Sequence, residues 1–152
     1  QDAPVAASAV DRRYLTGSQS YCQKRLLDFE AKGLKAGTVM GKQYKGVKIH
    51  GSARGRADDV NAAMIFDSNN PTGEDYDLEY SDRGNILILS EDGDKSDPDD
   101  NQDGGWLQFW FNPPVRLDSL VLLDAEKNTL VRLRNKKNKV IKDISVKGIK
   151  NN

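Results

Sequence analysis

The stretch Asn85–Phe111, NILILSEDGDKSDPDDNQDGGWLQFWF, sets the pattern of the whole chain. It begins with a short apolar run, continues into a loop rich in Asp and Gly, and ends in a segment of alternating large side chains. A short apolar run bounded by turn residues is typical of a core strand, and alternation with a period of two is typical of a strand with one buried face. The stretch therefore predicts two β-strands joined by a long acidic loop.

The same strand signals recur along the chain. They are spaced by 8–20 residues, with turns rich in Gly, Pro, Asn and Asp between them, and no amphipathic helix is evident after residue 25. The further strand candidates are residues 26–30, 44–50, 62–67, 115–124, 129–134 and 140–149. This pattern favours an all-β fold, an antiparallel β-sandwich of the jelly-roll type with long acidic loops.

The N-terminal segment has a different character. Residues 1–13 are rich in Ala and Ser and lack apolar periodicity, and residues 14–25 are compatible with a short helix. We therefore expect a tail or linker over residues 1–20 and a single β-sandwich domain over residues 21–152. The chain begins at Gln1, which favours a processed and secreted protein.

Charge is balanced over the chain but segregated along it. Residues 58–103 hold fifteen Asp/Glu and two basic residues, whereas residues 125–152 hold nine Lys/Arg and two Asp/Glu. A folded centre with such an imbalance repels itself unless its side chains extend into water or cations bridge them. Cys22 is the single cysteine, so no intrachain disulfide forms, and bound metal is another way to stabilise a secreted domain. We expect Cys22 to be a buried thiol, with an intermolecular disulfide as the alternative.

Two acidic segments form the candidate metal sites. In residues 65–78, IFDSNNPTGEDYDL, the side chains of Asp75 and Asp77 would point the same way in an extended segment, with Asp67 returning across the loop. Residues 91–105 hold seven acids against one lysine. Ca²⁺ binds about six to eight oxygen atoms in a flexible shell, which such loops supply. The alternative is that the acidic loops are simply solvated.

The second segment nearly fits the frame of an EF-hand over residues 92–103. The fit fails because the sixth position is Asp97 instead of Gly, the twelfth is Asp103 instead of Glu, and strand-like segments flank the loop. Zinc is poorly supported, because His50 and Cys22 are each single. The predicted calcium ligands are Glu30, Asp67, Asp75, Asp77, Glu91, Asp92, Asp94, Asp99, Asp100 and Asn101.

These acidic strings also carry a resemblance to a known family. The chain resembles, over residues 26–124, a module that recurs in secreted proteins of marine bacteria and some algae. The strings that carry it are LLDFE (26–30), QYKGVKI (43–49), AMIFDSNNPTGEDYDL (63–78), GNILILSEDGD (84–94), DPDDN (97–101) and LVLLD (120–124). The resemblance implies a calcium-stabilised jelly roll of the galactose-binding or carbohydrate-binding-module type, located outside the cell. The basic C-terminal third departs from the pattern of this module.

The alternating segment Trp106–Phe111 supplies a candidate ligand-binding surface. Trp106, Gln108 and Trp110 share one face of the predicted strand. If that face is exposed, two tryptophans flank an amide as a platform for sugar stacking; if both sheet faces are covered, they belong to the core. Tyr76, in the first acidic segment, is a further candidate ligand-binding residue.

The sequence argues against a catalyst. The lone His50 and Cys22 form no nucleophile–base arrangement, and residues 51–56, GSARGR, lack the following helix of a phosphate-binding loop. A glycosidase acid must be desolvated to hold its proton at neutral pH, and carboxylates crowded in a hydrophilic loop are not.

We therefore expect an extracellular calcium-binding module that binds a glycan or matrix surface. One alternative is a structural adhesion or assembly domain of a wall, matrix or mineral, in which calcium only rigidifies the fold; a glycan-active hydrolase is the third. Residues 132–142, RLRNKKNKVIK, predict either contact with a polyanionic surface or a polar hairpin turn. No apolar run is long enough to span a membrane, and a neutral chain without an aromatic–basic motif argues against nucleic acid.

Overall fold

The computed structural model describes residues 8–11, 23–125 and 127–148. The chain divides into two compact units: a terminal unit, made of residues 1–26 and 114–152, and a central unit, residues 27–113. In the described residues, regular structure consists of nine strands and one turn of 3₁₀ helix, η1 (Tyr76–Leu78). The prediction of an all-β protein is confirmed.

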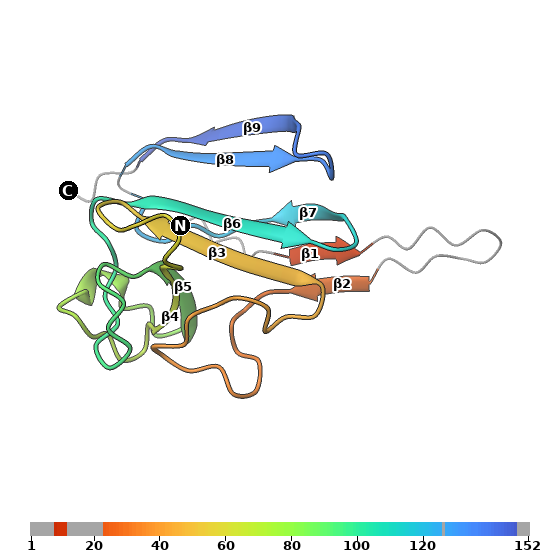
Figure 1. Ribbon diagram of the computed structural model, residues 1–152. Coiled ribbons are helices and arrows are strands. Elements are labelled where there is room, and N and C mark those ends of the chain that lie inside the picture. Colours follow the sequence, from red (N-terminus) through yellow and green to blue (C-terminus); the bar gives the residue numbers. More distant parts are fainter. Residues whose placement is uncertain (1–7, 12–22, 126, 149–152) are drawn as a thin grey trace. The chain divides into compact units, whose positions relative to one another are not determined.

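The central unit contains two antiparallel ribbons (Figure 1). Strand β3 (Val47–Ala53) pairs with β6 (Gly105–Phe111), and β4 (Ala63–Asp67) pairs with β5 (Asn85–Leu89). A backbone hydrogen bond connects the ribbons: Ala62, which precedes β4, donates to the Gly51 carbonyl of β3 at 2.9 Å. The hydrogen bond from Ser90 to the Ala62 carbonyl, at 2.8 Å, extends the β4–β5 pairing. Gly51 permits this approach: a Cβ there would lie 2.7 Å from Cδ2 of Leu89.

Strand β4 is buried on both faces, which explains why its sequence is continuously apolar. Ala63 and Ile65 belong to one core cluster, and Met64 and Phe66 belong to the other. Leu78, from the turn η1, packs in the second cluster. The loop that carries Asp75 and Asp77 is therefore anchored to the core at its far end.

The terminal unit contains a three-stranded antiparallel sheet and a hairpin. In the sheet, β1 (Ser8–Asp11) lies between β2 (Gln23–Leu26) and β7 (Val115–Ser119). Strands β8 (Thr129–Arg134) and β9 (Val140–Val146) form the hairpin (Figure 1).

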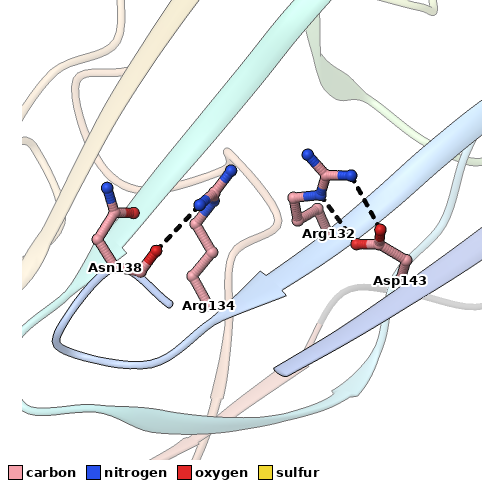
Figure 2. A network of polar contacts seen from close by, with 4 residues as sticks. All are labelled: Arg132, Arg134, Asn138 and Asp143. Atoms are coloured by element: carbon pink, nitrogen blue, oxygen red, sulfur yellow. Dashed lines mark hydrogen bonds and ion pairs between the residues drawn. The ribbon is translucent and has the colours of Figure 1, made fainter. Parts of the chain in front are cut away.

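The β8–β9 hairpin is held by polar contacts of its own. Arg132 donates two hydrogen bonds of 2.9 Å to the carboxylate of Asp143, its partner across the ribbon, and Arg134 donates to the Asn138 carbonyl at 2.9 Å (Figure 2). In the turn, the backbone N–H of Asn135 donates to the carbonyl of Lys139. The prediction of a polar hairpin turn at this basic segment is confirmed.

The structure corrects two local predictions. Strand β1 lies within residues 1–20, and the tail or linker expected over that segment stays a prediction. Strand β2 occupies the end of the segment expected as a short helix; Cys22 and residues 12–22 lie outside the described residues. Residues 27–30 form a loop instead of continuing a strand, since Phe29 has a φ of 61°. The single domain over residues 21–152 stays a prediction.

Candidate functional site

Two acidic loops of the central unit meet. One follows β4 over residues 68–78, and the other joins β5 to β6 over residues 91–103; together we name them the acidic loop pair. Three hydrogen bonds join them: the Thr72 hydroxyl donates to the Pro98 carbonyl at 2.6 Å, the Gly73 N–H to the Asp97 carboxylate at 2.9 Å, and the Asp100 N–H to the Asp75 carboxylate at 2.6 Å. The two segments predicted as separate metal sites therefore form one surface.

Gly73 allows the loops to approach this closely. Its φ is +62°, in the left-handed region, and a Cβ at this position would overlap the Cβ of Asp99. A side chain at Gly73 would therefore push the two loops apart and strain the backbone.

Carboxylates from the two loops act on one another. Burial raises the pKa of Asp75, and the charges of Asp77 and Glu91 raise it further. Burial also raises the pKa of Asp99, and so do the charges of Asp92, Glu91, Asp75 and Asp97, in that order. The Oδ1 atom of Asp99 is buried and has no hydrogen-bond partner in the described residues. Burial and the neighbouring negative charges thus both disfavour the ionised form of the Asp99 carboxylate.

Five of the acids proposed as calcium ligands act electrostatically on one another across the two loops: Asp75, Asp77, Glu91, Asp92 and Asp99. Asp100 lies at the same contact, because its backbone N–H donates to the carboxylate of Asp75. The structure also places Asp97, which was not among the candidate ligands, at the contact between the loops, where its carboxylate accepts the Gly73 N–H. Its place in the DPDDN run was the available signal.

Asp67 and Glu30 lie at the other end of the β4–β5 ribbon. Asp67 pairs with Asn85 at the start of β5, and Glu30 accepts a hydrogen bond from the N–H of Asn85 at 2.5 Å. The expected return of Asp67 towards Asp75 is replaced by the contact between Asp75 and Asp100. The expected extended segment is also corrected, because Tyr76–Leu78 form η1 and bury Leu78.

Asp94 and Asn101 have local structural roles within the second loop. Asp94 accepts hydrogen bonds from the hydroxyl and the N–H of Ser96, which lower its pKa. Asn101 is buried; its amide donates to the Arg54 carbonyl at 2.9 Å, and its Oδ1 accepts from the N–H of Asp103 at 2.9 Å. These bonds shape the loop and attach it to the end of β3. In the part of the chain that the structure describes, no three His, Cys, Asp or Glu side chains are grouped so as to hold a metal ion.

The β3–β6 ribbon exposes two tryptophans on one face. Trp106 is 44% exposed and Trp110 is 41% exposed, with the half-buried Gln108 between them. Their cross-strand neighbours on β3 are Ser52, His50 and Lys48. We name these six residues the tryptophan face. The opposite face of the ribbon contributes Val47, Ile49, Phe109 and Phe111 to the core. Tyr76, which is 69% exposed, lies on η1 in the acidic loop pair instead.

Each tryptophan borders a shallow cavity. The cavity beside Trp106 measures about 330 Å³ and is lined by Ser52, Ala53, Arg54, Gly55, Arg56, Asp58, Gly105 and Trp106. The cavity beside Trp110 measures about 260 Å³ and is lined by Lys42, Tyr44, Lys45, Gly46, Val47, Lys48, Trp110, Phe111 and Asn112. An exposed aromatic ring next to a hollow with polar groups is suited to stacking and hydrogen bonding of a small ring such as a sugar.

The cavity beside Trp106 has an ordered wall. The hydroxyl of Ser52 donates to the carboxylate of Asp58 at 2.6 Å, and the ring of His50 lies 5.6 Å from that of Trp106, between centroids. The guanidinium of Arg56 donates to the Ser90 carbonyl at 3.2 Å. These contacts hold the polar side chains in place, so little order would have to be gained on binding.

Comparisons with protein-family models, with curated proteins and with solved structures find no match to this chain. Among the residues that the structure describes, no helix has the length and apolar character needed to cross a membrane.

Proposed function

We propose that this protein is a non-catalytic extracellular module that binds a glycan chain on the tryptophan face of its central unit. The observation that carries the proposal is the exposure of Trp106 and Trp110 on one side of β6. Exposed aromatic rings that lie on the same face of a sheet are typical of a binding surface. Side chains four residues apart on a strand are separated by about 13 Å, a spacing that suits an extended ligand touching both rings.

Calcium binding by the acidic loop pair is the second part of the proposal. The buried, unpartnered Oδ1 of Asp99 and the raised pKa values of Asp75 and Asp99 support it. A divalent cation between the loops would offset the burial of charge and the repulsion that together raise these pKa values, and carboxylate oxygens are the ligands that calcium prefers. In this role calcium stabilises the loops that follow β4 and β5.

The finer features of the fold and the surroundings belong to the same proposal. We take the whole chain to form an antiparallel sandwich of the jelly-roll type, which the antiparallel pairing of all the described strands supports. The basic β8–β9 hairpin offers a further surface for polyanionic matrix material, since most of its side chains are exposed.

Affinity electrophoresis of the full chain with soluble polysaccharides, in millimolar calcium, tests the glycan proposal. The variant W106A/W110A should bind at least about tenfold more weakly than the wild type, because central aromatic side chains carry much of the free energy of such interfaces. The matched control is L122A, which removes an apolar side chain that is 38% exposed and lies outside both the tryptophan face and the hairpin.

The outcomes separate the functions. Equal binding by the wild type and W106A/W110A would remove the tryptophan face from the proposal. Absence of binding to every polysaccharide, by a folded and calcium-loaded chain, would favour a structural adhesion or assembly domain instead. Turnover of a polysaccharide would point to a hydrolase.

A further inference from the structure

The cavity beside Trp110 is lined by three lysines and one exposed aromatic ring. Lys42, Lys45 and Lys48 line it together with Trp110, and we name these four residues the lysine pocket. Its remaining lining residues are neutral. The carboxylates of Asp28 and Glu30 act on the hydroxyl of Tyr44 but do not line the cavity. Three cationic side chains therefore line one cavity of a unit whose loops are mostly acidic.

The backbone around the lysine pocket is held by short-range hydrogen bonds. The side chain of Gln43 accepts from the N–H of Gly41 at 2.6 Å and donates to the carbonyl of Val39 at 2.9 Å. The N–H of Asn112 donates to the carbonyl of Gly46 at 2.8 Å, which joins this turn to the end of β6. Lys42 and Lys45 thus start from a turn of fixed backbone and line the same cavity as Trp110.

Lys48 places its ammonium group beside the ring of Trp110. Its Nζ lies 4.9 Å from the centroid of the Trp110 ring, and the two residues are partners across the β3–β6 ribbon. A cation beside an indole is attracted to the ring face. One ligand residue stacked at Trp110 would therefore be within reach of an ammonium group.

We propose that the lysine pocket binds an anionic sugar residue, one that carries a sulfate or carboxylate group, within the glycan chain. The apolar face of the sugar ring stacks at Trp110, and its anionic group pairs with the ammonium groups of Lys42, Lys45 and Lys48. This inference rests on the proposed glycan-binding function and adds a charge requirement to it. A neutral glycan would gain stacking from the ring and nothing from the three cations.

Matched polysaccharides measure the charge requirement directly. Binding of the full chain to dextran is compared with binding to dextran sulfate, and binding to methyl-esterified pectin is compared with binding to its de-esterified form, by affinity electrophoresis in calcium. The anionic member of a pair should bind more tightly, and its binding should weaken as salt screens the exposed charges. The pair that shows the difference identifies the anionic group as sulfate or carboxylate.

The variant K42Q/K45Q tests the pocket itself, because it leaves the contact between Lys48 and Trp110 intact. It should bind the anionic polysaccharide about tenfold more weakly, the combined effect of losing two exposed ion pairs, with binding to any neutral polysaccharide unchanged. The control K32Q/K35Q removes the same charge from two exposed positions of the central unit that do not line the cavity, and it should have no comparable effect.

The possible failures are distinct. Binding to neutral polysaccharides that depends on the tryptophans, without preference for the anionic partner, would overturn the inference and leave the proposed function. Equal losses in K42Q/K45Q and K32Q/K35Q would show an unspecific response to net charge and overturn the inference. Single-stranded DNA bound as tightly as the anionic polysaccharide, with the same dependence on Lys42 and Lys45, would replace the sugar by a general polyanion. Absence of all polysaccharide binding would overturn both.

Discussion

The carboxylate of Asp75 accepts a hydrogen bond of 2.6 Å from the backbone N–H of Asp100, a residue 25 positions further along the chain. This bond joins the loop after β4 to the loop after β5 and brings two acidic segments into one place. Each loop alone would spread its charges into water. Burial and the charges of neighbouring acids raise the pKa values of Asp75 and Asp99, whereas this hydrogen bond itself lowers that of Asp75. The stability of the central unit is therefore expected to depend on pH.

Calcium is expected to stabilise the protein against thermal unfolding. A ligand that binds only the folded state at a hundred times its Kd adds about 2.7 kcal/mol per site. Extracellular modules bind calcium with Kd of roughly 10⁻⁴–10⁻³ M, so millimolar calcium should raise the melting temperature by several degrees and magnesium should raise it less. Asp99→Asn should reduce the calcium effect, because it removes one of the repelling carboxylates. Calorimetric titration together with melting curves in calcium and in chelator measures both.

The control for Asp99→Asn is Asp82→Asn, which removes an exposed carboxylate beside Arg83. It should leave the calcium response unchanged. In chelator Asp99→Asn should be more stable than the wild type, because the substitution removes a carboxylate charge that burial disfavours. No heat of binding at millimolar calcium, and no change in melting, would remove calcium from the proposed function.

The stability of the calcium-free protein should fall as pH rises above the usual carboxyl range. The pKa values of Asp75 and Asp99 are raised in the folded state, so the folded chain keeps protons that the unfolded chain has already lost. Their contribution to stability is therefore present below the ordinary carboxyl pKa and is lost as pH rises through the raised values. Urea unfolding in chelator, from about pH 4 to pH 7 at constant low salt, measures the slope. The unfolding free energy of D75N/D99N should fall less over this pH range than that of the wild type. The same slope for the two proteins would contradict this electrostatic explanation.

Gly73→Ala should destabilise the protein more than Gly55→Ala. Both glycines have positive φ, so both substitutions carry a backbone strain of about 1–3 kcal/mol, but only the Cβ at Gly73 meets the opposite loop, at Asp99. At Gly55 an added Cβ meets nothing within 4 Å. The difference in urea midpoints isolates the contact between the loops. Calcium affinity should fall for Gly73→Ala and not for Gly55→Ala, and equal effects of the two substitutions would show that the loops are free to separate.

Truncation of the exposed tryptophans should leave the fold nearly intact. Phe66 is fully buried in the core, and Phe66→Ala should cost about 3–5 kcal/mol of unfolding free energy. Trp106→Ala and Trp110→Ala should cost much less, because both rings are more than 40% exposed. Chemical denaturation of the three variants checks this. Tryptophan variants as unstable as Phe66→Ala would mean that the rings support the fold, and a loss of glycan binding could then not be assigned to the tryptophan face.

The strands of the central unit could be predicted because their signals are local. In β3 and β6 the apolar residues alternate, as in Val47 and Ile49, and alternate side chains of a strand point to opposite faces whatever the rest of the chain does. The continuous run of β4 predicted a buried strand for an equally local reason. Residues 27–30 were predicted wrongly because the positive φ of Phe29 ends the extended backbone within an otherwise apolar run.

The amino-acid sequence by itself determined that the chain is almost entirely β, that the acids lie in the loops and that Trp106 and Trp110 share a face. The tertiary structure decided that Asp75 contacts Asp100, that the face with the two tryptophans is exposed, and that Lys42, Lys45 and Lys48 line one cavity with Trp110. The reason is that side-chain periodicity acts over a few residues, whereas the path of a loop depends on distant contacts. Two contacts fix the path of the first acidic loop: Leu78 packs in the second core cluster, and Asp75 accepts a hydrogen bond from Asp100. Neither contact can be predicted from the spacing of the acids along the chain.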